Sequence, residues 1–323
     1  MTNKNHNFFA GKVIVDLSHP VGSQSPQWPY FPQPEITRAH GLAKSGVLTQ
    51  FFKMPMHCGT HADSPRHVIE TEFDGRRARY THEMDLEAYC GDAVCLDLSH
   101  LEQWTLIKAE HMDEALAKTG VTHEELKDMI VIIYTGMAEQ WDDSKQYYHY
   151  ATGVGASVGH WCMKHDIKAL GVDQQALDHP LHTSIGEKLA GRLSMGLEGY
   201  SGLPLRHEYI EKFGIEEFAH FDRDLYKEIH GEEAYQELYG LVEEKGMCNG
   251  VWEPCHKLLL GNGKVGWENV GGNVAKIAGK RCTIIGVPLN LYCGDGSMSR
   301  LMAVIDEDQV NEVPDRVYPY GDH

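Results

Sequence analysis

The chain has 323 residues, of which 42% are hydrophobic and 24% are charged. These values are ordinary for a folded globular protein, exclude a disordered chain, and allow a sizeable core. Lysine and arginine number 29 against 47 aspartate and glutamate, so the formal net charge is −18. A charge of this sign disfavours nucleic acid and anionic membrane surfaces as partners, but it does not exclude a small-molecule substrate.

The N-terminal segment and the hydrophobic runs predict a cytoplasmic protein. Residues 1–10 are polar and lack the apolar core of a signal peptide, and no run of about 18 apolar residues could span a membrane. The eight cysteines form no Cys-x-x-Cys pair. We therefore expect free thiols and no zinc site built from cysteines.

Strand and helix patterns follow one another through the first half of the chain. Residues 12–17 are typical of a buried strand, and the proline- and aromatic-rich segment 26–34 can be neither helix nor central strand. Residues 50–56 predict a strand that runs into the histidine-rich segment described below. Further strands are predicted at 93–98, 129–134 and 168–172, and helices at 107–118 and 158–165. This mixture indicates an α/β or α+β fold.

Residues 206–245 differ from the rest of the chain, because they are rich in Glu, Tyr and Phe. They predict two or three helices, broken at Gly214 and Gly231. We interpret residues 186–247 as a helical insertion within one domain that spans 1–323. Alternatively, its aromatic side chains could wall a pocket or form a subunit interface.

The segment Met-His-Cys-Gly-Thr-His-Ala-Asp-Ser-Pro-Arg-His at residues 56–67 carries the chemistry. His57, His61, Asp63 and His67 offer imidazole nitrogens and a carboxylate, which are the usual ligands of Zn²⁺ or Mn²⁺. A nearby base that is not a ligand could serve as the proton partner of an activated water.

The backbone of this segment must bend if its side chains are to share an ion. A straight strand would separate the Cα atoms of His57 and His61 by about 13 Å, which is too far for one metal ion. Pro65 argues against a helix, and Gly59 supplies backbone freedom between the two histidines. We predict a bent strand-to-loop segment.

This segment resembles the cyclase-like family of metal-dependent hydrolases, which includes bacterial kynurenine formamidases, isatin hydrolases and trans-dienelactone hydrolases. Residues 57–67 match the family pattern His-x-Gly-Thr-His-x-Asp-x-Pro-x-His at every fixed position. The resemblance implies that His57, His61 and Asp63 bind the metal and that His67 is the catalytic histidine.

Four further segments also resemble parts of that family: 13–20, 171–178, 256–269, and 288–297 together with Arg300. In relatives with two metals, residues that match His256 and Glu268 hold a second ion, bridged by the equivalent of Asp63. The family likeness further implies a mixed β-sheet core flanked by helices, of the swivelling β/β/α type, and a homodimer or larger homo-oligomer.

Two other groups of residues could line the site. The aromatic side chains of Trp28, Tyr30 and Phe31 could cover a flat, partly apolar substrate, although a rigid surface loop is the simpler interpretation. His179 and His182 flank Pro180, and they form either a polar loop or part of a pocket.

Together these residues predict a hydrolase that holds one or two Zn²⁺ or Mn²⁺ ions. A metal-bound water attacks the carbonyl carbon of a small cyclic amide, lactone or aryl formamide, and His67 accepts and returns the proton. A kynurenine formamidase proper is one alternative. A non-catalytic protein stabilised by a metal is a second, and a hydrolase with a nucleophilic serine or cysteine, such as Cys58, is a third.

Overall fold

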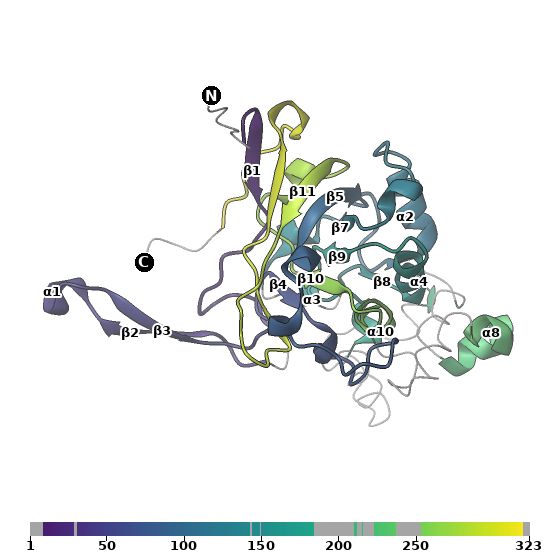
Figure 1. The fold of residues 1–323 in the computed structure, drawn as a ribbon, viewed down its shortest axis with the longest axis horizontal. Coiled ribbons are helices and arrows are strands. Elements are labelled where there is room, and N and C mark those ends of the chain that lie inside the picture. The colour runs from purple at the N-terminus through teal and green to yellow at the C-terminus, as the bar shows by residue number, and fades with distance from the viewer. Residues whose placement is uncertain are drawn as a thin grey trace, which may run out of the picture.

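The computed structural model describes residues 9–28, 31–142, 144–148, 150–183, 210–211, 215, 223–236 and 253–318. A nine-stranded mixed sheet forms the centre of the molecule, in the order β1-β13-β11-β5-β7-β9-β10-β4-β12 (Figure 1). Its strands are β1 (Lys12–Asp16), β4 (His61–Asp63), β5 (Cys90–Asp97), β7 (Ile130–Tyr134), β9 (Ala169–Val172), β10 (Val265–Glu268), β11 (Arg281–Ile285), β12 (Gly296–Met298) and β13 (Met302–Asp306).

Helices and two small sheets surround this main sheet. The helices are α1 (Leu42–Ser45), α2 (Ala109–Leu116), α3 (Lys145–Tyr148), α4 (Ala156–Lys164), α8 (Arg223–Tyr235) and α10 (Pro254–Gly261). The small sheets pair β2 (Glu35–His40) with β3 (Thr49–Lys53), and β6 (Leu106–Ile107) with β8 (Gly153–Val154). The architecture is the predicted α/β fold, a mixed sheet flanked by helices.

The strands β5, β7, β9 and β10 pair in parallel at the centre of the sheet. Antiparallel pairs extend the sheet on both sides, through β11, β13 and β1 on one and through β4 and β12 on the other. Central parallel strands are buried on both faces, which explains the continuous Ile-Val-Ile-Ile run of β7.

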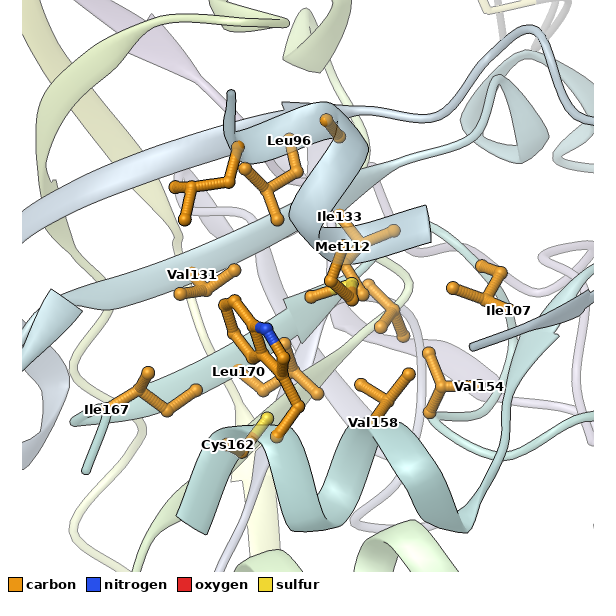
Figure 2. Packing of buried hydrophobic residues seen from close by; sticks show 14 of the residues in the cluster. Leu96, Ile107, Met112, Val131, Ile133, Val154, Val158, Cys162, Ile167 and Leu170 are labelled. Carbon is orange, nitrogen blue, oxygen red and sulfur yellow. The ribbon is translucent and has the colours of Figure 1, made fainter. Parts of the chain in front are cut away.

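Alternation along β7 sends its side chains into two separate cores. Val131 and Ile133 pack with Met112 of α2 and Val158 of α4 (Figure 2). Ile130 and its second neighbour Ile132 belong instead to a cluster with residues of β1, β10, β11 and β13, because the sheet curls and its outer strands cover the inner face.

Most of the strands and helices predicted in the first half are confirmed, with ends that differ by a few residues. The predicted segments 12–17, 93–98, 129–134 and 168–172 correspond to β1, β5, β7 and β9, and the two helices correspond to α2 and α4. Residues 26–28 and 31–34 contain no helix or strand, as expected for the proline-rich segment.

The strand predicted at residues 50–56 is present in part, but its predicted continuation into the histidine segment is wrong. Strand β3 ends at Lys53 and pairs with β2 in a separate hairpin, so it does not run into the histidine segment. This hairpin extends away from the main sheet, with α1 at its tip (Figure 1). Every residue of β2 and β3 is exposed, and large apolar side chains are among them.

Most of the predicted insertion at 186–247, including Gly214, lies outside the described residues. Within it, α8 contains the predicted break at Gly231, whose φ of 87° and ψ of 164° are not helical. Tyr226 and Tyr235 of α8 pack with Ala156 of α4 and Leu258 of α10. Of the helices that the structure describes, none has the length and apolar character needed to cross a membrane.

Candidate metal centre

Strand β4 places the histidine segment between two partners in the sheet. His61 pairs with Glu268 of β10 on one side and with Met298 of β12 on the other. Directly opposed residues of antiparallel strands project from the same face, so the His61 and Glu268 side chains meet. The side chain of Thr60 adds a further tie, because its Oγ1 donates to the carbonyl oxygen of Asn269 at 2.5 Å.

The predicted bend lies at Gly59, whose φ of 60° falls in the left-handed region. A Cβ atom at this position would lie 2.4 Å from Cγ2 of Val21, so glycine is required both by conformation and by space. The bend turns His57 back toward Asp63. Pro65 then begins a short 3₁₀ turn, Pro65–His67, which brings His67 to the same place.

Asp63 lies at the centre of the cluster and is fully buried. Its Oδ1 is 2.7 Å from Nδ1 of His57 and 3.4 Å from Nε2 of His61. Its Oδ2 is 3.7 Å from Nε2 of His256, a residue of α10. The carboxylate therefore faces three imidazoles from two distant parts of the chain.

Glu268 completes the cluster from the end of β10. Its Oε1 lies 2.8 Å from Nε2 of His256, and its Oε2 lies 3.3 Å from Nε2 of His61. The N–H of Leu177 donates to Oε1 at 2.8 Å and holds the carboxylate in place. The structure thus brings together the side chains predicted as metal ligands: His57, His61, Asp63, His256 and Glu268.

His57, His61 and His256 each direct one ring nitrogen toward the carboxylates of the cluster and use the second ring nitrogen for a contact outside it. Nε2 of His57 lies 3.0 Å from Oδ2 of Asp295, and Nδ1 of His256 lies 2.7 Å from Oδ2 of Asp178. Nδ1 of His61 donates to the carbonyl oxygen of Gly59 at 2.8 Å. Metal-binding histidines are held in this way, because a proton on the outer nitrogen leaves a lone pair on the inner one.

Two inward-facing atoms of the cluster support the presence of a cation. Nε2 of His61 and Oδ2 of Asp63 are buried, and neither has a hydrogen-bond partner among the described residues. Buried polar atoms without partners are costly, and a divalent cation would satisfy both. The nitrogen and oxygen donors fit Zn²⁺ or Mn²⁺.

The electrostatic field of the site also favours positive charge. Burial alone would lower the pKa of His57, but Asp63 and Asp295 raise it to about 10. Burial would likewise raise the pKa of Asp63, yet the surrounding histidines hold it well below its usual range. Protons and metal ions compete for such ligands, so the same field would bind a dication.

His67 lies beside the cluster, with its ring centroid 3.9 Å from that of His57. Its Nδ1 is 3.6 Å from Oδ2 of Asp295. Burial and then the neighbouring His57 lower the pKa of His67, so its imidazole is neutral near neutral pH and can accept a proton. A ligand atom of His67 also lies within 4.8 Å of those of His57 and Asp63.

A cavity of about 250 Å³ opens directly onto the cluster. Trp28 and Phe31 of the aromatic segment line it, while Tyr30 lies outside the described residues. The polar wall includes Gln175 and Glu253. The remaining lining residues are Pro26, Gln27, His57, Gly59, His61, His67, Val68, Tyr147, Tyr148, Ala176, His256, Glu268 and Asn269.

A family model described as "Putative cyclase" matches residues 15–179, which is just over half of the chain and includes the histidine segment. The chain belongs to the cyclase family.

Solved structures with this cyclase fold span nearly the whole chain. Isatin hydrolase A from Labrenzia aggregata is 18% identical with a TM-score of 0.60, and the match covers 92% of this chain and 95% of that one. Isatin hydrolase A from Ralstonia solanacearum is 15% identical with a TM-score of 0.64, over 94% and 99%. A predicted metal-dependent hydrolase from Bacillus stearothermophilus is 16% identical with a TM-score of 0.54, over 91% and 98%. No curated protein matches this cyclase-family chain.

His179 and His182 do not belong to the described lining of the cavity. Nε2 of His179 donates to the carbonyl oxygen of Trp104 at 3.0 Å, and burial lowers the pKa of this histidine to about 3. The carbonyl oxygen of His182 accepts the N–H of Glu253 at 2.7 Å. Both residues are buried in this cyclase fold and support the loops around the site.

The environments of two candidate nucleophiles argue against the serine and cysteine alternatives. Cys58 is buried, Nε2 of Gln27 donates to its Sγ at 3.0 Å, and burial raises the pKa of its thiol. Residues 155–159 form a Gly-x-Ser-x-Gly sequence, but the Oγ of Ser157 accepts the N–H of Ala109 at 3.3 Å. Neither residue is among those described as lining the cavity.

Sequence reasoning missed three acidic residues at the site: Asp178, Glu253 and Asp295. Asp178 and Asp295 lie in segments that resemble the family, but neither has a local spacing that marks a ligand or its support. Asp178 accepts the N–H groups of Cys255 and His256 at the start of α10, so it positions the helix that carries His256.

Proposed function

We propose that this cyclase-family chain is a metal-dependent hydrolase that cleaves or opens a small cyclic amide, lactone or aryl formamide. The observation that carries the proposal is the convergence of five side chains beside a cavity: His57, His61, Asp63, His256 and Glu268. Two of their buried atoms, Nε2 of His61 and Oδ2 of Asp63, have no hydrogen-bond partner in the described part of the chain. Such a site has ligands for a metal ion and space for a substrate next to it.

In this proposal the five residues hold one or two Zn²⁺ or Mn²⁺ ions. A bound divalent cation supplies Lewis-acid chemistry, since it polarises a carbonyl group and lowers the pKa of a water. Asp63 would be the central ligand, because its two oxygens face different histidines.

His67 is the proposed general base and acid. Its imidazole is free to take the proton of the attacking water and to return it to the leaving nitrogen or oxygen. The contact with Asp295 orients the ring for both steps. Trp28 and Phe31, which line the cavity, would pack against a flat, partly apolar substrate.

An isatin-like ring is the first substrate to test, because two of the similar structures are isatin hydrolases. The purified protein should be assayed before chelation, after chelation, and after reloading with Zn²⁺ or Mn²⁺. The panel should contain an isatin-type ring, an aryl formamide and an unsaturated lactone, with metal content measured in each sample. We expect hydrolysis of at least one compound, lost on chelation and restored by metal.

Two other results would contradict this function. A chelator that lowers the melting temperature of a protein inactive on every compound would indicate a non-catalytic, metal-stabilised binding protein. Activity that survives complete metal removal would indicate a nucleophilic hydrolase.

We further propose that the protein is a cytoplasmic homodimer or larger homo-oligomer. The seven described cysteines are free, as suits a reducing compartment. The projecting β2–β3 hairpin exposes Leu42, Phe51 and Phe52, and large exposed apolar side chains are typical of protein interfaces. Light scattering should give at least twice the chain mass, and Phe51→Ser with Phe52→Ser should reduce it. A monomeric wild-type protein would contradict the proposal.

A further inference from the structure

Glu253 is a buried acidic residue of the cavity wall for which the proposed chemistry has no role. It immediately precedes α10, three residues before His256, and lines the same cavity as His67 and Trp28. Only 9% of its surface is exposed. A carboxyl group is costly to bury without a partner, so its position needs a reason.

The backbone holds Glu253 in an unusual conformation. Its φ of 47° and ψ of 56° lie in the left-handed region, which is strained for a residue with a Cβ atom. Its N–H donates to the carbonyl oxygen of His182 at 2.7 Å, and its own carbonyl oxygen accepts the N–H of Lys257 at 3.1 Å. Such strain persists where the surrounding structure imposes it, often at functional sites.

The carboxyl group of Glu253 differs from the other buried acids of the site. Asp178 accepts three hydrogen bonds, and Glu268 accepts the N–H of Leu177 and faces two histidines. No residue within the described ranges donates a hydrogen bond to the Glu253 carboxyl group. Because Glu253 lines the cavity, its carboxyl oxygens can accept a hydrogen bond from a molecule bound there.

We propose that Glu253 is a specificity-determining residue whose carboxylate accepts a hydrogen bond from an N–H group of the substrate. The inference rests on the proposed function and narrows its substrate class to amides and lactams that keep an N–H. A lactone or an N-alkylated lactam would leave the buried carboxylate without a partner. Sites built around a hydrogen bond reject analogues that lack it, because the unpaired group pays its desolvation cost.

The test compares two ligands that differ only in the donor, 2-oxindole and N-methyl-2-oxindole. Titration calorimetry at pH 8.5 measures their binding to the Mn²⁺-loaded protein. Because this method measures binding directly, the test does not depend on turnover. We expect the wild type to bind 2-oxindole at least about 10-fold more tightly, which corresponds to about 1.4 kcal/mol. Equal affinities, or no binding of either compound, would overturn the inference.

Variants separate the hydrogen bond from a steric effect of the methyl group. Glu253→Leu should abolish the preference, whereas Glu253→Gln should retain part of it because its amide oxygen still accepts. Glu114→Leu, at an exposed position of α2, is the matched control and should bind as the wild type does. A preference that survives unchanged in Glu253→Leu would be steric and would overturn the proposal. If that variant does not fold, Glu253→Gln decides: an unchanged preference with this neutral, weaker acceptor contradicts the proposal.

Hydrolysis rates distinguish failure of this inference from failure of the proposed function. A protein that binds 2-oxindole in a Glu253-dependent way but hydrolyses nothing contradicts the function and supports the inference. An enzyme that hydrolyses isatin and N-methylisatin with equal kcat/KM supports the function and contradicts the inference.

Discussion

Nε2 of His57 lies 3.0 Å from Oδ2 of Asp295, although the two residues are 238 positions apart in the sequence. Strand β12 creates this contact, because Gly296 pairs with Asp63 and carries Asp295 to the edge of the cluster. The carbonyl oxygen of Asp295 is fixed by the N–H and the Oγ of Ser64, at 3.0 Å and 2.8 Å. One carboxylate thereby orients both a candidate metal ligand and the nearby His67.

Asp295→Asn should lower kcat/KM by about 10- to 100-fold, since outer partners of metal-binding histidines contribute on this scale. Hydrogen bonds from His57 and His67 hold the pKa of Asp295 well below its usual range, so the wild-type group is a carboxylate at every pH of interest. Steady-state kinetics and elemental analysis would measure the effect. Asp308→Asn, at an exposed position, is the matched control. An Asp295→Asn enzyme with wild-type kinetics would show that this contact has no part in the reaction.

His67→Ala should retain the metal but lose kcat by about 10²-fold or more, because a general base contributes at this level. The substitution removes a proton acceptor but none of the five proposed ligands. Metal content and single-turnover rates should be measured on the same preparation. If the variant turned over normally, His67 would have no role in proton transfer; if it lost its metal, His67 would act as a ligand.

Asp63→Ala should lose both the metal and the activity. The carboxylate lies between His57, His61 and His256, and its removal leaves the imidazoles without the central negative charge that draws a cation to them. Elemental analysis after extensive dialysis is the direct measurement. A fully metallated and active Asp63→Ala protein would contradict the ligand assignment. Loss of metal with an unchanged circular dichroism spectrum would separate ligation from folding.

The stability of the protein should fall on acidification below pH 6.5, in part because of His179. Burial lowers the pKa of this histidine from 6.5 to about 3 in the native state. Between these values the unfolded chain binds a proton that the native protein excludes, so stability decreases as the pH falls. At pH 5 the loss from this residue is about 2 kcal/mol relative to pH 7.5.

Urea unfolding at pH 7.5 and pH 5 would measure this effect. His179→Gln keeps a donor for the carbonyl oxygen of Trp104 but does not titrate. Its stability should therefore depend less on pH than that of the wild type, by about 2 kcal/mol over this interval. The control His100→Gln, at an exposed site, should behave as the wild type does. Identical pH dependence in His179→Gln and the wild type would refute the assignment.

Local signals in the sequence were sufficient to predict the central strands, the helices α2 and α4, and the bend at Gly59. Apolar periodicity reports burial within one element, and the steric properties of glycine and proline act over a few residues. The same local spacing predicted a site at His57, His61, Asp63 and His67, because a short bent segment can bring the four side chains close together. His256 and Glu268 were identified by family resemblance, since neither carries such a spacing.

Only the tertiary structure decided which distant residues meet this segment. The register of β4 between β10 and β12 determines that Glu268 faces His61 and that Asp295 reaches His57. The placement of β3 in a separate hairpin was equally beyond local reasoning, since its sequence suits either sheet. Asp178 and Asp295 are single acids that become important through the histidines they contact in the folded chain, and Glu253 through its place in the cavity lining. Strand pairing between segments hundreds of residues apart has no signature in the neighbourhood of either segment, which is why these contacts could not be predicted.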